Sequence, residues 1–413
     1  MINCIKPFVF DGIYLTFSMR YFIPFLFLSL QMLTQVFAQE NMPRFRRQVV
    51  DDKISIGYGL AIGDVDGDKK PDIILADKKQ VVWYRNGNWE KTVIAENLTE
   101  SDNVCVAAAD IDGDGKVEIA VGAQWNPGET ADDAKSGAVF YLKRPAEING
   151  LWQPVKLHHE PTVHRMKWIK SGDGKFYLVV APLHGRGNKQ GEGRGVKILA
   201  YQFNGDGTSN WPLTLLDSTL HLTHNFIPEP DKTGVTTAVY IASKEGVRFL
   251  KPLNLGTNSL PVSPGVNLMN NSAGEISLGN LTTASPFIST IEPMHGNSLV
   301  VYEKINDRFN RTILDSTFNE GHGIAAGDFL NLGNDQVLAG WRQPNSNGKT
   351  GLKIYARTNS KSEWKSYWLD EGGIAVEDVQ AADLNGDGKV DIIASGRSTR
   401  NVVIYWNEGT VKK

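Results

Sequence analysis

Cysteine is nearly absent from this sequence. Cys4 and Cys105 are the only two cysteines among its 413 residues. Cys4 falls in an N-terminal segment that we expect to be removed, and Cys105 lies inside the apolar run at residues 104–107. Because a lone buried thiol is chemically inert, we expect neither a disulfide framework nor thiol catalysis.

An excess of charge of one sign is also lacking. The 43 Lys and Arg residues nearly balance the 46 Asp and Glu residues, and no basic run forms a stripe that could follow a phosphate backbone. Nucleic acid is therefore not an expected partner. The sequence contains no Gly-x-Ser-x-Gly elbow, Walker loop or dinucleotide fingerprint. The glycine-rich residues 191–195 bridge two expected strands, so we interpret them as a rim loop.

Long apolar runs are limited to one, at residues 21–37, and the small residue Ala38 follows it. This pattern is typical of a secretory signal peptide. A retained membrane anchor is the alternative, but the run is shorter than the roughly 20 residues that a spanning helix needs. We therefore predict a signal peptide at residues 1–38 and a mature secreted or periplasmic domain at residues 39–413, without a membrane anchor after cleavage.

Acidic loops recur along the chain. Each has the form Asp-x-Asp/Asn-Gly-Asp with a further carboxylate four residues later, and each lies between two short apolar runs, which indicates a β-hairpin closed by the loop. Such loops gather oxygens around one point, as Ca²⁺ or Mg²⁺ requires. We predict structural metal sites, with plain acidic turns as the alternative. The residues are Asp64, Asp66, Asp68 and Asp72, then Asp110, Asp112, Asp114 and Glu118, then Asp383, Asn385, Asp387 and Asp391.

A second element recurs between the loops, namely an aromatic residue followed by a polar strand that ends in an aliphatic residue. These segments are predicted to be the outermost strands of successive four-stranded blades. Phe45 fits the same pattern but precedes the first acidic loop, so the N-terminal segment should complete the last blade and leave no open sheet edge. The aromatic residues of the later segments are Trp89, Trp152, Trp211, Phe309 and Trp364.

Aligning the units on the first aspartate of the acidic loop defines the repeat. The sequence thus predicts an all-β, seven-bladed β-propeller closed by an N-terminal strand that completes the last blade. Residues 254–285 align least well because no Trp marks an outer strand there, so six or eight blades stay possible. The aligned positions are Asp64, Asp110, Lys170, Pro230, Asn280, Asp328 and Asp383.

The repeats resemble the FG-GAP/VCBS family of propeller repeats, the type also found in integrin α-chains. The resemblance is carried by the three intact acidic loops and a partial loop at Gly327-Asp328. It implies a propeller fold and calcium in the loops. It does not imply an activity, because unrelated functions are built on one fold.

Histidines converge on the face opposite the acidic loops. Each first strand begins on this face, and the loops that join second to third strands return to it. The residues at the start of the first strands and the residues of these loops should therefore meet at one rim of the channel. Five of the eight histidines fall in these sets, which favours a functional cluster over separate packed or solvated histidines. The first-strand positions are Tyr58, Val104, His164, His224, Gly274, His322 and Glu377, and the loop positions include Trp125, His184, His295, Arg342 and Arg397.

Neutral imidazoles from different blades can hold Zn²⁺ or another divalent metal and leave positions open for a substrate. We predict His164, His224 and His322 as ligands because they share one repeat position. Histidine can also transfer protons near neutral pH. The predicted catalytic residues are His184, His295 and Tyr58, and the predicted substrate-binding residues are Arg186, Arg342, Arg397, Trp125 and Glu377.

Three segments resemble the propeller part of aldos-2-ulose dehydratase and its bacterial relatives: residues 158–166, residues 182–187 and residues 320–323. That family eliminates water from keto-sugars such as 1,5-anhydrofructose at a metal-containing propeller site. The resemblance implies a metal-dependent lyase or dehydratase whose substrate is a small sugar or glycoside.

Two other classes of function stay open. The chain can be a calcium-stabilised propeller that binds carbohydrate or protein without catalysis, or a polysaccharide lyase or hydrolase. The sequence does not identify the substrate, the rim metal, the histidine that acts as acid or base, or the oligomeric state.

Overall fold

The computed structural model describes residues 41–412, apart from 206, 251–254, 256–264, 283–284, 307 and 358–362. The predicted signal peptide lies outside the described residues. Pro43–Gly409 form one compact unit, to which the following description applies. Within the described part of the chain, no helix is long and apolar enough to span a bilayer.

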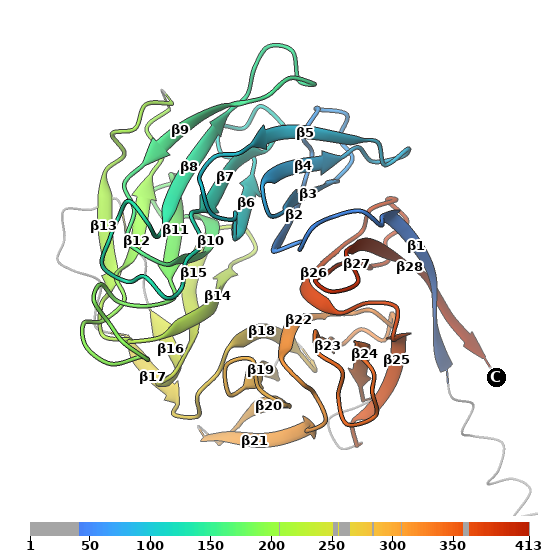
Figure 1. Cartoon of the computed structure of the whole chain (residues 1–413). Coiled ribbons are helices and arrows are strands. Elements are labelled where there is room, and N and C mark those ends of the chain that lie inside the picture. The colour runs from blue at the N-terminus through green and yellow to red at the C-terminus, as the bar shows by residue number, and fades with distance from the viewer. Residues whose placement is uncertain are drawn as a thin grey trace, which may run out of the picture. The chain divides into compact units, whose positions relative to one another are not determined.

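The described residues form seven antiparallel sheets of four strands each, arranged as blades around a central axis (Figure 1). This confirms the predicted seven-bladed β-propeller. Blades one to three contain β2 (Gly59–Gly63), β3 (Asp72–Ala76), β4 (Gln80–Tyr84) and β5 (Lys91–Glu96); β6 (Cys105–Ala109), β7 (Glu118–Ala123), β8 (Ala138–Lys143) and β9 (Gln153–Leu157); and β10 (Val163–Lys170), β11 (Phe176–Pro182), β12 (Ile198–Gln202) and β13 (Leu213–Asp217). Blades four to six contain β14 (Thr223–Pro230), β15 (Thr236–Ser243), β16 (Gly246–Leu250) and β17 (Val266–Met269); β18 (Glu275–Asn280), β19 (Pro286–Glu292), β20 (Ser298–Ile305) and β21 (Arg308–Asp315); and β22 (Gly321–Gly327), β23 (Gln336–Trp341), β24 (Gly351–Ala356) and β25 (Lys365–Glu371).

The seventh blade joins the two ends of the propeller. It contains β26 (Val376–Ala382), β27 (Asp391–Gly396), β28 (Asn401–Lys412) and, as its outer strand, β1 (Asn41–Asp51). Figure 1 shows β1 beside β28, as the position of Phe45 predicts. The Trp406 indole donates a hydrogen bond of 2.8 Å to the side chain of Gln48. Pairing the first strand with the last leaves no open edge at this junction.

The acidic-loop alignment places every blade in register. Each aligned residue is either the last residue of a first strand, as Lys170 is in β10, or the residue directly after it, as Asp64 is after β2. The weakly aligned fourth blade has its outer strand at β17, where no Trp marks it. Apolar side chains of adjacent blades fill the junctions between them, so the core is a ring of interfaces rather than one central cluster.

A tyrosine–aspartate pair links neighbouring blades at three junctions. In each pair the aspartate is the last or next-to-last residue of the outer strand of one blade, and its carboxylate accepts a hydrogen bond from a tyrosine on the third strand of the next. Burial, together with the neighbouring carboxylate, raises the pKa of each tyrosine. The O···O distances are 2.8 Å for Tyr84 and Asp51, 2.6 Å for Tyr355 and Asp315, and 2.6 Å for Tyr405 and Asp370.

Candidate metal and substrate site

β-Bulges turn four side chains toward the channel mouth. Near the start of the first strand in four blades, the pairing with the second strand skips one residue. In each case the skipped residue is the one that the repeat alignment predicts to face the rim. A bulge disrupts the ladder locally and can re-aim a side chain. In the fifth blade β18 pairs regularly from its first residue, Glu275. The bulged residues are His164, His224, His322 and Glu377.

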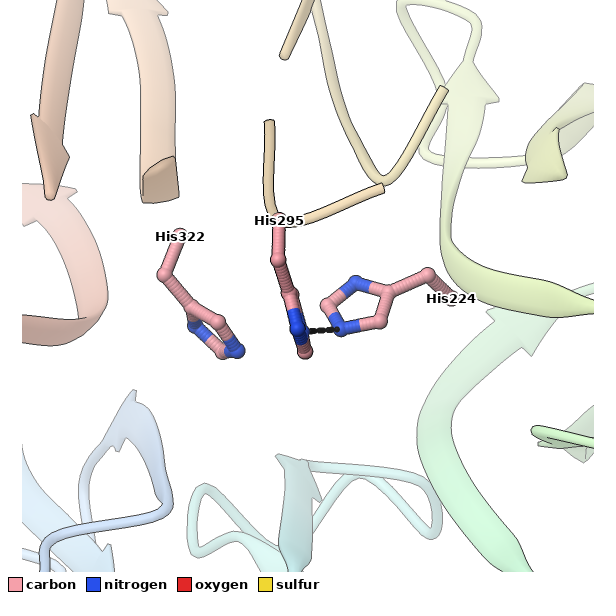
Figure 2. Close-up of side chains that lie close together, drawn as sticks. All are labelled: His224, His295 and His322. Carbon is pink, nitrogen blue, oxygen red and sulfur yellow. Dashed lines mark hydrogen bonds between the residues drawn. The ribbon is translucent and has the colours of Figure 1, made fainter. Parts of the chain in front are cut away.

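Three histidines meet at this mouth. One ring nitrogen from each of His224, His295 and His322 lies within 4.8 Å of the others. Figure 2 shows the His295 ring between the other two, and its Nε2 is 2.7 Å from Nε2 of His224. His295 comes from the loop between β19 and β20 and has a φ of 52°, a left-handed conformation that only a tight turn normally imposes. The three imidazoles thus come from three different blades and meet at one point.

Acceptors on the far side of two rings orient them. Nδ1 of His224 is 2.9 Å from a carboxylate oxygen of Glu275, although the pair does not meet hydrogen-bond geometry and neither atom has a hydrogen-bond partner. Nδ1 of His322 faces the backbone carbonyl oxygen of Glu377 at hydrogen-bond distance. With a proton on Nδ1, each ring presents the lone pair of Nε2. Metal-binding histidines characteristically have such partners behind them.

The third ring has a different partner. A guanidinium nitrogen of Arg342 lies 3.3 Å from Nδ1 of His295. Because guanidinium only donates, this contact favours the tautomer of His295 with its proton on Nε2, and that proton then points at Nε2 of His224. His295 can join the other two as a metal ligand only if this hydrogen bond is released.

Burial keeps these imidazoles neutral. It lowers the pKa of His164, His224 and His322 well below the ordinary value, and nearby arginines reinforce the effect. For His295, burial, with smaller effects of His224 and Arg342, lowers the pKa to about 3. Neutral imidazoles are the form that binds metal ions. Burial raises the pKa of Glu275 at the same time, against the opposing effect of Arg165.

His164 lies beside the three-histidine group rather than in it. Its ring centroid is 4.6 Å from that of His224, and its other face stacks on Trp125 at 4.8 Å. Both of its ring nitrogens are buried without a hydrogen-bond partner. The predicted ligand set therefore differs from the observed group, in which His295 takes the place of His164.

The predicted substrate-binding residues Arg342, Arg397 and Glu377 form one network. Both guanidinium groups bind the Glu377 carboxylate, at 3.1 and 2.8 Å, and Arg397 also lies over the ring of Tyr58. The Tyr58 hydroxyl donates to Asp102 at 3.1 Å. Burial and this carboxylate raise the pKa of Tyr58 to about 12. Tyr58 is therefore protonated near neutral pH and can donate a proton but not accept one.

His184 and Arg186 lie in a separate part of the rim. Arg186 pairs with Glu160 at 3.1 Å and with Asp133 at 2.8 Å. His184 is half-buried, and its backbone N–H donates to Thr162. Among the described residues, no ring contact or hydrogen bond connects either side chain to the three-histidine group. Their catalytic and binding roles stay predictions.

Sequence reasoning missed three residues that surround the histidines. Glu275 follows the aligned Gly274 by one residue, and Arg165 and Asn225 each follow a bulged histidine. Asn225 donates a hydrogen bond to Glu275, and Arg165 lies 3.7 Å from it. Below them the channel holds a cavity of about 40 Å³ lined in part by Lys167. A bulge places two consecutive side chains near the channel, a signal that a search at one repeat position does not detect.

The acidic loops lie at the opposite ends of the first strands. In the first loop, oxygens of Asp64, Asp66 and Asp72 lie within 4.8 Å of one another, and the second loop groups Asp110, Asp112 and Glu118 in the same way. Burial beside other carboxylates raises the pKa of Asp72 to about 7 and that of Glu118 to about 7. A bound cation would relieve this repulsion. Asp68, Asp114 and the loop of Asp383, Asn385, Asp387 and Asp391 fall outside these two groups.

Two family models match this part of the sequence. The FG-GAP-like repeat matches residues 64–121, and the FG-GAP repeat matches residues 106–142. The matches cover the first two acidic loops, and the seven blades continue the same unit around the ring. The chain is a β-propeller that contains FG-GAP repeats.

Comparison with known proteins shows the fold of this FG-GAP propeller and nothing finer. None of the curated proteins compared with it matches significantly. A structure of BBS1N in complex with ARL6DN is 10% identical, with a TM-score of 0.54, over 90% of this chain and 98% of that one. A chain of the mitotic checkpoint complex is 11% identical, with a TM-score of 0.52, over 89% and 96%.

A third similar structure is the extracellular domain of a protein described as a hybrid two component system from B. thetaiotaomicron. It is 13% identical with a TM-score of 0.50, over 88% of this chain. This chain spans only 40% of its length. At such low identity these similarities show a shared fold and no shared function.

Proposed function

We propose that this FG-GAP propeller is a secreted, metal-dependent lyase that eliminates from a keto-sugar or keto-glycoside, such as 1,5-anhydrofructose. The observation that carries the proposal is the group of His224, His295 and His322. Its members are neutral, converge from three blades, and in two cases have an acceptor behind Nδ1.

The donor set fits a divalent transition metal such as Zn²⁺. Imidazole nitrogens are preferred ligands of that metal, and three protein ligands leave a position for substrate. His224 and His322 would hold it through Nε2, and His295 would be the third ligand. When bound, the metal supplies a Lewis acid that polarises the ketone of the substrate.

The chain itself provides groups for the two proton transfers. His164 is neutral, has no hydrogen-bond partner at either ring nitrogen and lies beside His224, which supports it as the base that would accept the proton from the carbon next to the ketone. His184 on the same rim is the alternative base. As that C–H bond breaks and a C=C bond forms, the C–O bond to the β-oxygen breaks. Tyr58, which is protonated near neutral pH, can donate its hydroxyl proton to the leaving oxygen.

Other rim residues would bind and orient the sugar. Arg397 is about one third exposed and fixed by Glu377, so its remaining N–H groups can donate to sugar hydroxyls. Trp125 offers an aromatic face, one side of which stacks on His164. These contacts would hold the ring against the histidines and exclude water from it.

The decisive experiment combines elemental analysis with an activity assay. Purified protein should contain a transition metal. Metal-loaded protein should convert 1,5-anhydrofructose to a product that has lost one water, or a 3-keto-glycoside to a product that has lost one alcohol, as measured by mass spectrometry. His322→Ala should abolish turnover, whereas His221→Ala, which removes a histidine paired with Glu245, should not. If metal-loaded and metal-stripped protein both leave these substrates unchanged, the lyase proposal fails.

One observation favours a second candidate, a propeller that binds carbohydrate or protein without catalysis. His224 and His322 are only 1% and 3% exposed, so access to them is narrow. In that case the protein would contain no transition metal, and replacing the three histidines by Ala would spare binding. A polysaccharide lyase or hydrolase would instead release shortened chains, which product mass identifies.

We also propose that Ca²⁺ or Mg²⁺ occupies the acidic loops and that residues 1–38 direct export. The loops support the first point through their grouped carboxylates, which already lie close together. Their role would be structural, because a cation that binds only the folded state adds stability by linkage.

A further inference from the structure

A separate pocket lies between the fourth and fifth blades. Its volume is about 600 Å³. Its walls are mainly apolar and aromatic, with Tyr240 and Phe249 on the fourth blade and Phe309 on the fifth, and its polar groups include Glu229 and Lys304. It opens near the first-to-second strand loops, on the face opposite the histidines.

The repeat explains why a pocket forms at this junction. Phe309 occupies the position that Trp152 holds in the second blade and Trp364 in the sixth. Trp152 is buried between blades, and Trp364 packs against Phe287 of the preceding blade. At the junction of blades four and five the smaller phenyl ring of Phe309 is present instead of an indole, and space is left.

In the second and sixth blades a cationic side chain lies over the indole, and the fifth blade has a cationic residue at the same position. Arg144 lies 4.6 Å from the ring centroid of Trp152, and Arg357 lies 5.1 Å from that of Trp364. Lys304 pairs with Phe309 in the β20–β21 ladder, and extending the ladders of the second and sixth blades by one pair gives the same relationship. The fifth blade thus keeps the positive charge but lacks the indole.

We infer that this pocket binds a small molecule with a flat aromatic ring of indole size that carries an N–H or O–H donor. The ring would take the place of the missing indole, with its face toward the Lys304 ammonium, an arrangement that attracts a cation to a π-system. The Glu229 carboxylate, which already accepts a hydrogen bond from Tyr240, can accept another from the donor. The inference is independent of the proposed lyase activity, because the pocket and the histidines lie on opposite faces.

Calorimetric titration of the full chain with indole tests this inference. We expect saturable binding at one site. Phe309→Trp should fill the pocket and weaken binding at least about 10-fold, while the thermal midpoint stays the same or rises, as filling a cavity predicts. Phe45→Trp is the matched control, because Phe45 has the same repeat position in the last blade, and it should leave indole affinity unchanged.

Two further variants test the inference without relying on Phe309→Trp. Lys304→Met should weaken indole binding roughly threefold, as the loss of a partly exposed cation–π contact predicts. Trp364→Phe should create an equivalent space in the next junction, so that indole raises the thermal midpoint of that variant more than that of the parent. These measurements retain their meaning if Phe309→Trp does not fold.

Three results would overturn the inference. They are the absence of indole binding to the parent protein, unchanged binding by folded Phe309→Trp and Lys304→Met, and tighter binding of N-acetyltryptophanamide than of indole. The last result would assign the pocket to a tryptophan side chain of a peptide rather than to a small molecule.

Discussion

The carboxylate of Glu275 lies 2.9 Å from Nδ1 of His224, a residue of the neighbouring blade, and both side chains are almost completely buried. This contact places an anion behind a ring whose other nitrogen faces the centre of the three-histidine group. The carboxylate favours the Nδ1–H tautomer of His224 and increases the basicity of Nε2. The charge of Glu275 should therefore affect metal binding, although the carboxylate itself lies behind the ligand.

The first prediction concerns that charge. Glu275→Gln keeps the shape of the side chain and removes its negative charge, so transition-metal affinity should fall about 10- to 100-fold. Competition against a chromophoric chelator measures the change. Glu160→Gln removes a buried carboxylate from a different part of the rim and serves as the control. Equal affinity in the parent and Glu275→Gln proteins would contradict the assigned role.

The second prediction concerns the ionisation of Tyr58. Its pKa is raised from 10.0 to about 12, so the folded protein keeps this proton where an unfolded chain loses it. The resulting contribution to stability is fully present below pH 10 and is lost as the pH rises from 10 to 12. Tyrosinate absorbance at pH 10.5 should therefore be the same in folded parent and Tyr58→Phe proteins. A lower absorbance in the variant would mean that Tyr58 ionises with an ordinary pKa.

The third prediction concerns the link between the fifth and sixth blades. Tyr355→Phe removes the hydroxyl that donates to Asp315 at 2.6 Å. The free energy of unfolding should fall by about 2 kcal/mol, the typical contribution of a hydrogen bond to a charged group. Urea denaturation measures it. Tyr367→Phe is the control, because no hydrogen bond of its hydroxyl is observed among the described residues. A loss no greater than that of the control would show that the pair adds little.

The fourth prediction concerns the acidic loops. Removing Ca²⁺ with a chelator should lower the free energy of unfolding, by about 2.7 kcal/mol for each occupied loop relative to protein with free Ca²⁺ at 100 times its Kd. Asp112→Asn should reduce this dependence on Ca²⁺, because Asp112 belongs to the second carboxylate group. Asp133→Asn, an exposed change on the other face, should not. If Ca²⁺ leaves the denaturation curve of the parent protein unchanged, the loops are acidic turns without a metal.

Much of the fold could be predicted from the sequence because its signals are local. The acidic loop needs only the spacing from Asp64 to Asp72, and a hairpin forms around it wherever apolar runs flank it. Phe45 could be assigned to the last blade because its segment is an outer strand without a blade of its own. The fourth blade was the hardest to align, since β17 has no aromatic marker and sequence spacing alone does not define an unmarked strand.

The site could be predicted only in part. His224 and His322 were found because they share a repeat position, and His295 because its loop returns to the same rim. Arg165 was not found, because the bulge in β10 brings a second residue of the strand to the channel and the repeat position marks only one. Glu275 was not found, because it begins a strand without a bulge and follows Gly274, the residue at the repeat position. The separation of His164 from the three-histidine group also depends on side-chain orientation, which no spacing in the sequence contains.

The sequence by itself determined the register of the blades, the closure by β1 and the face on which the histidines gather, and it predicted seven blades with six or eight left open, a number that the structure fixed at seven. Those properties follow from strand alternation and loop position, which are set within each repeat. The tertiary structure decided which imidazoles meet, which atoms lie behind them and where a missing indole leaves a pocket. These depend on distances between blades, and such distances exist only once all seven blades have closed into a ring.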